Sequence, residues 1–175
     1  SFYADDPLNG KVAAEMGVIM GTSHHEPMAR NHQEWARKRN EYGAWDYGTN
    51  QKVIDKFFRE GIERAKDTED LITIGMRGDG DTAMGGKEGH DDEFVPDYAY
   101  MIKMMQKIFN NQRKIIRNVT GRPASERPQV WALYKEVQTL YEKGLRVPDD
   151  VTILLSDDNW GDVRKLPNAE ERKHP

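Results

Sequence analysis

Side chains that can move protons or bind charged ligands gather in four places along this chain, each directly after a short apolar run. Histidines and carboxylates can act as general acids or bases, and an arginine offers a planar fork that matches a carboxylate. The carboxyl ends of parallel strands form the ligand face of α/β folds, so four such groups in succession predict a functional site there. The groups are His24, His25 and Glu26; Arg77, Asp79 and Asp81; Tyr134 and Glu136; and Asp157, Asp158 and Asn159.

The first group combines two adjacent histidines with Glu26. These residues could serve as metal ligands, as a general acid or base, or as hydrogen-bond partners of a sugar. Neighbouring residues of an extended segment point to opposite sides, so we do not expect His24 and His25 to bind one ion. An equally good interpretation is that one imidazole packs in the core while the other is solvated.

The second group, MRGDGD at residues 76–81, suits the recognition of an anion. Arg77 can pair with a carboxylate, and the glycines let the backbone approach a ligand closely. The spacing also resembles the start of a calcium loop, although the later ligand positions of an EF-hand are not met. A solvated Gly–Asp turn without a ligand is the simpler alternative.

Glu136 and Asp157 are the carboxylates best suited to acid/base work. Cleavage of a glycosidic bond needs one carboxyl group to protonate the leaving oxygen and a second to activate water or attack the sugar. In the alternative interpretation, Glu136 is an exposed helix residue, and Asp157 or Asp158 caps a helix.

Three aromatic residues, Trp45, Tyr47 and Trp160, fall in segments expected to be loops. A ring in such a position can stack on a sugar. Packing inside the protein is the commoner use of loop aromatics, so both interpretations stay open.

Strand and helix patterns alternate along the chain. Continuous apolar strands joined by helices are typical of a parallel sheet that is buried on both faces. We expect strands at residues 17–21, 71–76, 129–133 and 151–155, and helices at 34–39, from a cap at Thr49 or Asn50 to Ala65, at 97–118 up to a stop at Gly121, and at 136–143.

A barrel and a doubly wound open sheet both satisfy this order of elements. No Gly-rich phosphate fingerprint follows the first strand, and a full barrel takes about 250 residues and eight strands. We therefore expect an α/β fold that is part of a (β/α)8 TIM-type barrel, with about four β/α units. Residues 1–167 would form the partial barrel and residues 168–175 a polar C-terminal tail of this piece of a longer chain.

Composition narrows the classes of ligand and partner. The 175 residues are 37% hydrophobic and 32% charged, as in globular domains. A net charge of −4 argues against nucleic acid as the main partner, while a local cation can still bind an acidic sugar. The absence of cysteine excludes disulfides and thiolate metal sites. No run approaches the roughly 20 apolar residues of a membrane helix, so we expect neither nucleic acid nor membrane as a partner.

Four segments together resemble glycoside hydrolase family 115, the xylan α-1,2-glucuronidases. They are GTSHHEPM at residues 21–28, WDY at 45–47, TIGMRGDGD at 73–81 and SDDNWGDVRKLP at 156–167. The resemblance implies a (β/α)8 catalytic domain in a large multidomain enzyme, commonly a homodimer, that needs no metal or organic cofactor. It implies release of glucuronic or 4-O-methylglucuronic acid from glucuronoxylan or aldouronic acid oligosaccharides by inverting hydrolysis. Because xylan cannot enter a cell intact, this substrate favours a periplasmic or secreted enzyme.

The resemblance also implies roles for individual residues. Glu136 would be a catalytic carboxyl group, and Arg77 would bind the carboxylate of the uronic acid. The expected catalytic residues are Glu136, Asp157, Asp79 and Asp81, and the expected substrate-binding residues are His24, His25, Glu26, Arg77, Asn159, Trp45 and Trp160.

Two other functions compete with this one. A metal-dependent hydrolase of barrel type would use His24 or His25 with Asp79, Asp81 and Asp157. A non-catalytic carbohydrate-binding module would use loop aromatic rings as platforms. We expect the 175-residue piece alone to be inactive, because half a barrel exposes unpaired strand edges and lacks half of the site.

Overall fold

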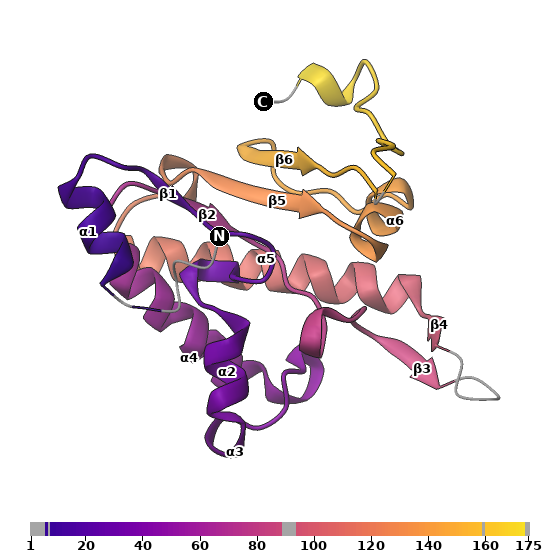
Figure 1. Ribbon diagram of the computed structural model, residues 1–175. Coiled ribbons are helices and arrows are strands. Elements are labelled where there is room, and N and C mark those ends of the chain that lie inside the picture. The colour runs from indigo at the N-terminus through magenta and orange to yellow at the C-terminus, as the bar shows by residue number, and fades with distance from the viewer. Residues whose placement is uncertain (1–5, 7, 89–93, 159, 174–175) are drawn as a thin grey trace.

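Four parallel strands in chain order form the central sheet (Figure 1). They are β1 (Met20–Gly21), β2 (Asp70–Thr73), β5 (Gln129–Leu133) and β6 (Val151–Leu155). The computed structural model describes residues 6, 8–88, 94–158 and 160–173. β5 and β6 have the bounds that the sequence predicts and pair from Gln129–Val151 to Leu133–Leu155. An α/β fold with a parallel sheet is therefore confirmed.

The first strand is shorter than expected. Only Met20 and Gly21 pair with β2, opposite Asp70 and Leu71. Because Asp70 is the first residue of β2, the residues before Met20 extend past the start of their neighbouring strand. Val18 and Ile19 are accordingly 50% and 66% exposed. The prediction of a strand at residues 17–21 was wrong for its first three residues.

Long helices cover one side of the sheet. Figure 1 shows α4 (Tyr47–Ala65) and α5 (Tyr98–Thr120) below the strands, and the two helices contact each other. A short antiparallel pair of strands, β3 and β4, lies between β2 and α5. The remaining elements are α1 (Asn9–Glu15), η2 (Pro27–Ala29), α2 (His32–Arg37), α3 (Arg39–Tyr42), η3 (Asp79–Asp81), β3 (Gly86–Glu88), β4 (Phe94–Pro96), η5 (Ala124–Glu126), α6 (Glu136–Glu142) and η6 (Glu171–Lys173).

Helix α4 begins earlier than the sequence suggests. Asp46 is its N-cap, because the carboxylate accepts a hydrogen bond from the N–H of Gly48 at 2.8 Å. Asn50 instead has a non-helical backbone (φ −127°), and its amide donates to the carbonyls of Tyr42 and Ala44. The prediction of a cap at Thr49 or Asn50 was therefore wrong, since Asn50 anchors the preceding loop.

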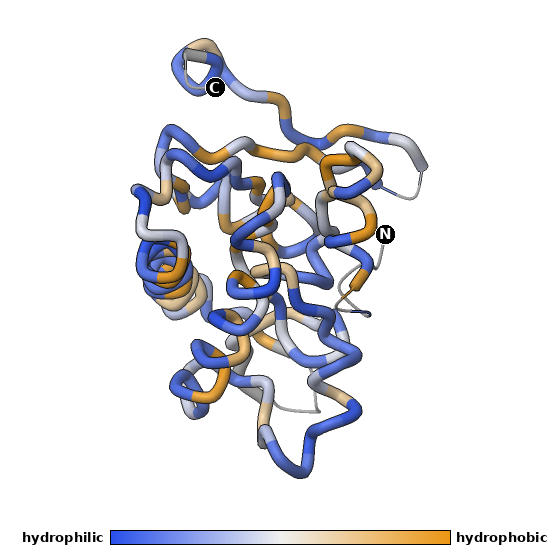
Figure 2. Tube along the Cα trace, turned by 90° about the vertical axis from the view of Figure 1, so that its left-hand side faces the viewer, coloured by the Kyte–Doolittle hydropathy of each residue, from blue (hydrophilic) through white to orange (hydrophobic). Residues whose placement is uncertain are grey.

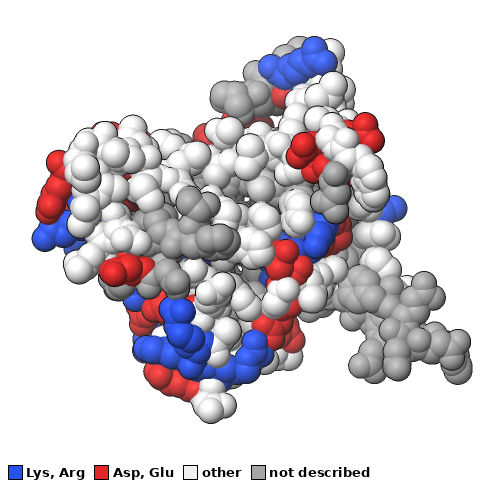
Figure 3. All heavy atoms as spheres, in the orientation of Figure 1, with Lys and Arg blue, Asp and Glu red and all other residues white. Residues whose placement is uncertain are grey.

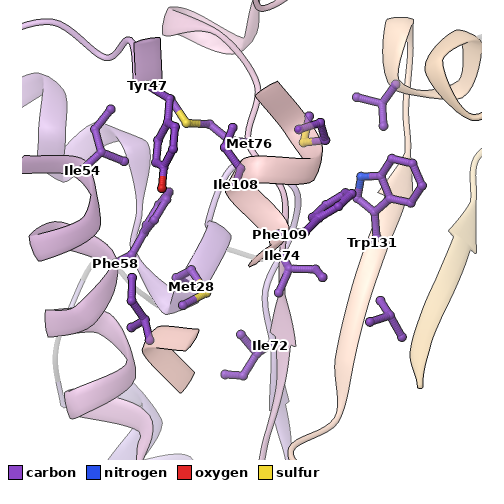
Figure 4. Packing of buried hydrophobic residues seen from close by; sticks show 14 of the residues in the cluster. Met28, Tyr47, Ile54, Phe58, Ile72, Ile74, Met76, Ile108, Phe109 and Trp131 are labelled. Atoms are coloured by element: carbon purple, nitrogen blue, oxygen red, sulfur yellow. The ribbon is translucent and has the colours of Figure 1, made fainter. Parts of the chain in front are cut away.

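The core lies between the two long helices and the sheet (Figure 4). Phe109 of α5 faces Trp131 of β5 with ring centroids 5.2 Å apart and near-perpendicular planes, an arrangement that aromatic pairs prefer. Tyr47 and Phe58 of α4 are fully buried on the other side of the cluster. Burial of this apolar surface against β2 and β5 is what fixes the sheet on its helices.

One buried polar residue interrupts the apolar face of α5. Gln112 is 0% exposed, and its amide makes both possible hydrogen bonds to the backbone of Gly75. The N–H of Gly75 donates to Oε1 at 2.7 Å, and Nε2 donates to the carbonyl of Gly75 at 2.8 Å. Gly75 has a φ of 96° and lies against Trp131, so a side chain there would be strained. Beyond the end of β2, the side chain of Gln112 thus provides the two hydrogen bonds that the backbone of a neighbouring strand would otherwise provide.

The interior strand β5 and the edge strand β6 differ in burial. All five residues of β5 are buried, as expected for a strand covered on both faces. In β6 burial alternates, and Leu154 is 52% exposed. The polypeptide after β6 runs away from the body of the molecule in Figure 2, and a salt bridge of 2.9 Å between Arg146 and Glu171 holds its last turn.

Among the helices that the structure describes, none has the combination of length and apolar character needed to span a bilayer.

Replacement of Gln112 by leucine should destabilise the intact protein that contains this chain. The buried N–H and C=O of Gly75 would lose their partners, and each unsatisfied group costs about 1–3 kcal/mol. Gln106→Leu, at an exposed position of the same helix, is the control. We expect thermal unfolding to show a clear drop in the midpoint for Gln112→Leu only. Equal midpoints for the two variants would contradict a structural role of Gln112.

Candidate active site

Arg77 is the centre of a buried ion cluster at the carboxyl ends of β2 and β5. Its Nε and Nη2 donate to the two carboxylate oxygens of Glu136 at 3.0 and 2.6 Å. Its Nη1 donates to the carboxylate of Asp81 and, at 2.5 Å, to the backbone carbonyl of the same residue. The arginine side chain is only 7% exposed. In this conformation Arg77 already donates its hydrogen bonds to two carboxylates of the protein. It was expected to bind the carboxylate of a uronic acid instead.

The backbone around Arg77 is fixed as firmly as its side chain. Trp45 donates from its indole nitrogen to the carbonyl of Arg77 at 2.9 Å. The following turn closes with a hydrogen bond of 2.9 Å from the N–H of Gly78 to the carbonyl of Thr82. Asp81, within this turn, has a φ of 63°, a strained value for a residue with a side chain. The turn aims Asp81 back at Arg77.

His24 and His25 point to the same side, which corrects the expectation of opposite directions. Their ring centroids are 4.2 Å apart, and each Nε2 faces a carboxylate oxygen of Asp81, at 3.5 and 3.8 Å. Residues 24–26 form a turn and a bend instead of an extended segment, so the alternation of a strand does not apply to them. Tyr134 continues the stack, with its ring centroid 4.5 Å from that of His24.

His24 is held in its neutral form at neutral pH. Burial, together with the neighbouring His25, lowers its pKa from 6.5 to about 4, against the opposing effect of Asp81. A neutral imidazole keeps one nitrogen as a donor and the other as an acceptor. His24 can thus exchange hydrogen bonds with a sugar hydroxyl, but it is not a charged partner for an anion.

Asp79 faces away from the Arg77 cluster, although it is only two residues away. Its carboxylate accepts two hydrogen bonds from Arg39, at 2.5 and 2.7 Å, and lies 3.1 Å from Nε2 of His32. Hydrogen bonding from Arg39 is the main cause that lowers the pKa of Asp79. The structure thus brings Asp81, but not Asp79, to the group formed by Glu136 and the two histidines.

Asp157 lines a second part of the site, at the ends of β5 and β6. It borders an open cavity of about 240 Å³ together with Tyr134, Lys135 and Trp160. The indole of Trp160 is 83% exposed, which leaves its faces accessible. Tyr134 belongs to both parts of the site, because it borders this cavity and its ring also lies against Arg77 and His24.

The other expected residues have different surroundings. Trp45 and Tyr47 are 6% and 0% exposed, so they pack in the core and offer no face to a sugar. Glu26 is fully buried at the base of the histidine turn, where Thr22 donates to its carbonyl at 2.9 Å. Asn159 lies outside the described residues.

A metal ion would find one set of ligands among the described residues, His24, His25 and Asp81, whose donor atoms lie within 4.8 Å of one another. Two imidazoles and a carboxylate are suitable ligands for a transition metal. The guanidinium of Arg77 is, however, already bonded to Oδ1 of Asp81, so a cation would share this carboxylate with a positive charge. Asp79, which the metal-dependent alternative also needs, is turned toward Arg39.

Acidic and basic side chains are mixed on the face shown in Figure 3, without a continuous region of one sign. Lys and Arg gather mainly over α2 and α3, with acidic residues beside them. The charges that matter for the site are therefore the local ones described above.

The family model described as Glycosyl hydrolase family 115 matches residues 1–175. The chain belongs to glycosyl hydrolase family 115. A solved structure described as a novel family GH115 4-O-methyl-α-glucuronidase with specificity for decorated arabinogalactans is similar to it, with a TM-score of 0.84 and 32% sequence identity. The match covers 99% of this chain and 22% of that one, so the chain spans about a fifth of the length of this relative. No curated protein matches the chain.

Family 115 membership was expected from the sequence and is confirmed. The sequence-based list of site residues nevertheless omitted Lys135 and His32, and it left Tyr134 without a role. Tyr134 and Lys135 directly follow β5, the same position relative to a strand that singled out the other residues. His32 follows no strand and gave no comparable signal.

The depressed pKa of His24 predicts a pH dependence of stability. The folded protein resists protonation of His24 down to about pH 4, whereas the unfolded chain binds a proton near pH 6.5. The stability contributed by the neutral ring is thus complete above pH 6.5 and is lost as the pH falls from 6.5 toward 4. We expect His24→Gln in the intact protein to lose less thermal stability than wild type between pH 7 and pH 4.5. Parallel losses would contradict this assignment.

Proposed function

We propose that the protein containing this chain is a glycosidase that releases glucuronic or 4-O-methylglucuronic acid from glucuronoxylan and aldouronic acid oligosaccharides. Membership of a glycosyl hydrolase family over residues 1–175 supports the reaction class. The similarity to a 4-O-methyl-α-glucuronidase supports the type of sugar that is released. The polysaccharide itself is inferred from the family resemblance of the sequence motifs.

The observation that carries this proposal is the placement of two carboxylates on neighbouring strand ends. Glu136 begins α6 just after β5, and Asp157 follows β6, which pairs with β5 along its whole length. Glycoside hydrolysis requires two carboxyl groups on either side of the scissile bond. The cavity that Asp157 borders also includes residues on both sides of the Glu136 backbone, namely Lys135 and Gln138.

The surroundings of Glu136 suit a general base. Each of its oxygens accepts one hydrogen bond from Arg77 and keeps a second lone pair that can take a proton from water. Arg77 then acts as a positioning residue for Glu136. Asp157 becomes the candidate for the general acid, because it lies in the other part of the site.

The strand order supports a barrel as the parent architecture. Strands β1, β2, β5 and β6 follow one another in space as they do in the chain, whereas doubly wound sheets reverse direction at a switch point. We propose that these units are four of the eight in a (β/α)8 domain, with the site at its carboxyl-terminal face.

Replacement of Glu136 by glutamine should lower the rate of uronic acid release from glucuronoxylan at least 10²-fold, the usual effect of losing an acid/base carboxyl group. The variant is tested in the intact protein, and unfolding midpoints confirm that it folds. Glu142→Gln, at an exposed position of the same helix, is the matched control. Release at the wild-type rate by Glu136→Gln would exclude Glu136 from the chemistry.

Inverting hydrolysis of an α-linked uronic acid predicts that the β-anomer appears first. Proton NMR of the reaction within minutes of mixing would resolve the two anomers before they equilibrate. Initial accumulation of the α-anomer would instead show retention and a covalent intermediate on one of the two carboxylates.

A second candidate substrate is an arabinogalactan decorated with the same uronic acid, because the similar solved structure has that specificity. Parallel assays on both polysaccharides distinguish the two. If uronic acid is released from arabinogalactan alone, the proposed reaction stands, and arabinogalactan replaces xylan as the proposed polysaccharide.

A further inference from the structure

Among the residues with described positions, three cationic side chains lie around the two parts of the site, and two of them are already paired. Arg77 donates to Glu136 and Asp81. Arg164 borders the cavity beside Asp157 and pairs with Asp158 at 3.3 Å. A uronic acid that enters this site brings a further negative charge to a region that already holds several carboxylates. The uronic acid therefore needs a cation that is not already paired with a carboxylate of the protein.

Lys135 is such a cation. Among the residues that the structure describes, it makes no ion pair and no side-chain hydrogen bond. Its ammonium group lies 5.1 Å from the centre of the Tyr134 ring, and the side chain borders the cavity that also contains Asp157. Lysine offers a compact charge with three donors, which can bind a carboxylate from several directions.

The backbone at Lys135 is in an unusual conformation. Its φ is 51°, which is rare for a residue with a long side chain and costs on the order of 1–3 kcal/mol. This strained residue links β5 to α6 and lies at the exposed border of the cavity. Strain of this kind gathers at functional sites, where the direction of one side chain matters more than local stability.

The dimensions and the lining of the cavity fit a single acidic sugar. Its volume of about 240 Å³ is below the range of about 300–1,000 Å³ for drug-sized ligands. The exposed ring of Trp160 offers a stacking surface at one side, and Ser156 offers a hydroxyl. Lys135 is the cation of this cavity that is free to meet the carboxylate of the ligand.

We propose that Lys135 binds the carboxylate of the uronic acid and thereby sets the preference of this site for an acidic over a neutral sugar. This inference rests on the proposed function and replaces the role first expected for Arg77. Arg77 holds Glu136 in place, while Lys135 recognises the substrate.

The test compares two forms of one substrate in the intact protein. The first is an aldouronic acid oligosaccharide, and the second is its neutral twin, in which the carboxyl group has been reduced to an alcohol. We expect Lys135→Met to lower kcat/KM on the acidic substrate about 10–100-fold, the worth of a hydrogen bond to a charged group. Activity on the neutral twin should stay within about 2-fold, and Lys135→Arg should restore most of the preference.

Each outcome bears on a different claim. Lys103→Met, at an exposed position of α5, controls for the loss of a surface charge and should match wild type. An acidic-to-neutral ratio unchanged in Lys135→Met would overturn the role of Lys135 while leaving the glucuronidase intact. Equal losses on both substrates would show a merely structural residue. No uronic acid release by wild type would reject the proposed function itself.

A glycine variant provides a test that does not depend on turnover alone. Glycine adopts positive φ without strain, so Lys135→Gly should raise the midpoint of thermal unfolding while it removes the preference for the acidic substrate. A lower midpoint together with a retained preference would contradict both the strain and the binding role.

Discussion

The contact between Gln112 and Gly75 is the constraint on which the site depends. Strand β2 ends at Thr73, and the chain beyond it must leave the sheet without leaving buried backbone groups unpaired. The amide of Gln112 supplies the missing donor and acceptor from a helix on the other side of the core. Two residues later the chain reaches Arg77, so the position of α5 determines where the guanidinium lies.

The site is organised by charge matching around that guanidinium. Arg77 binds Glu136 and Asp81, and Asp81 in turn faces the stacked rings of His24 and His25. The cluster draws on three neighbouring strand ends, because the histidines follow β1, Arg77 and Asp81 follow β2, and Glu136 follows β5. A parallel sheet in chain order suits this arrangement. Among the described residues of this face, Lys135 carries the charge that no carboxylate pairs with. It is one residue from Glu136, so the proposed catalytic and recognition residues share one strained connection.

The histidine turn depends on close packing below it. Met28 has a φ of 57° and is fully buried, and Gly61 of α4 passes so near that an added Cβ would lie 2.0 Å from the carbonyl of Met28. Only a residue without a side chain allows α4 to approach this turn. The core of the domain therefore supports the turn that directs both imidazoles toward Asp81.

The sequence alone predicts the fold class and the family of this protein. The apolar runs of β5 and β6, the long periodic stripe of α5 and the glycine that ends it identify an α/β fold, because hydrophobic periodicity reports local burial directly. The motifs around His24, Arg77 and Asp157 identify the family.

Tertiary structure decided which of these residues meet. Asp79 and Asp81 differ by two positions, yet a turn with positive φ sends one to Arg39 and the other to Arg77. Trp45 resembles an exposed loop aromatic in sequence and is buried under the Arg77 carbonyl. Gln112 is a polar residue within the apolar stripe of α5. Its role becomes clear only from the tertiary structure, in which it bonds to the backbone of Gly75. Local patterns record whether a residue is buried, whereas the partner of a buried polar group depends on segments far apart in the chain.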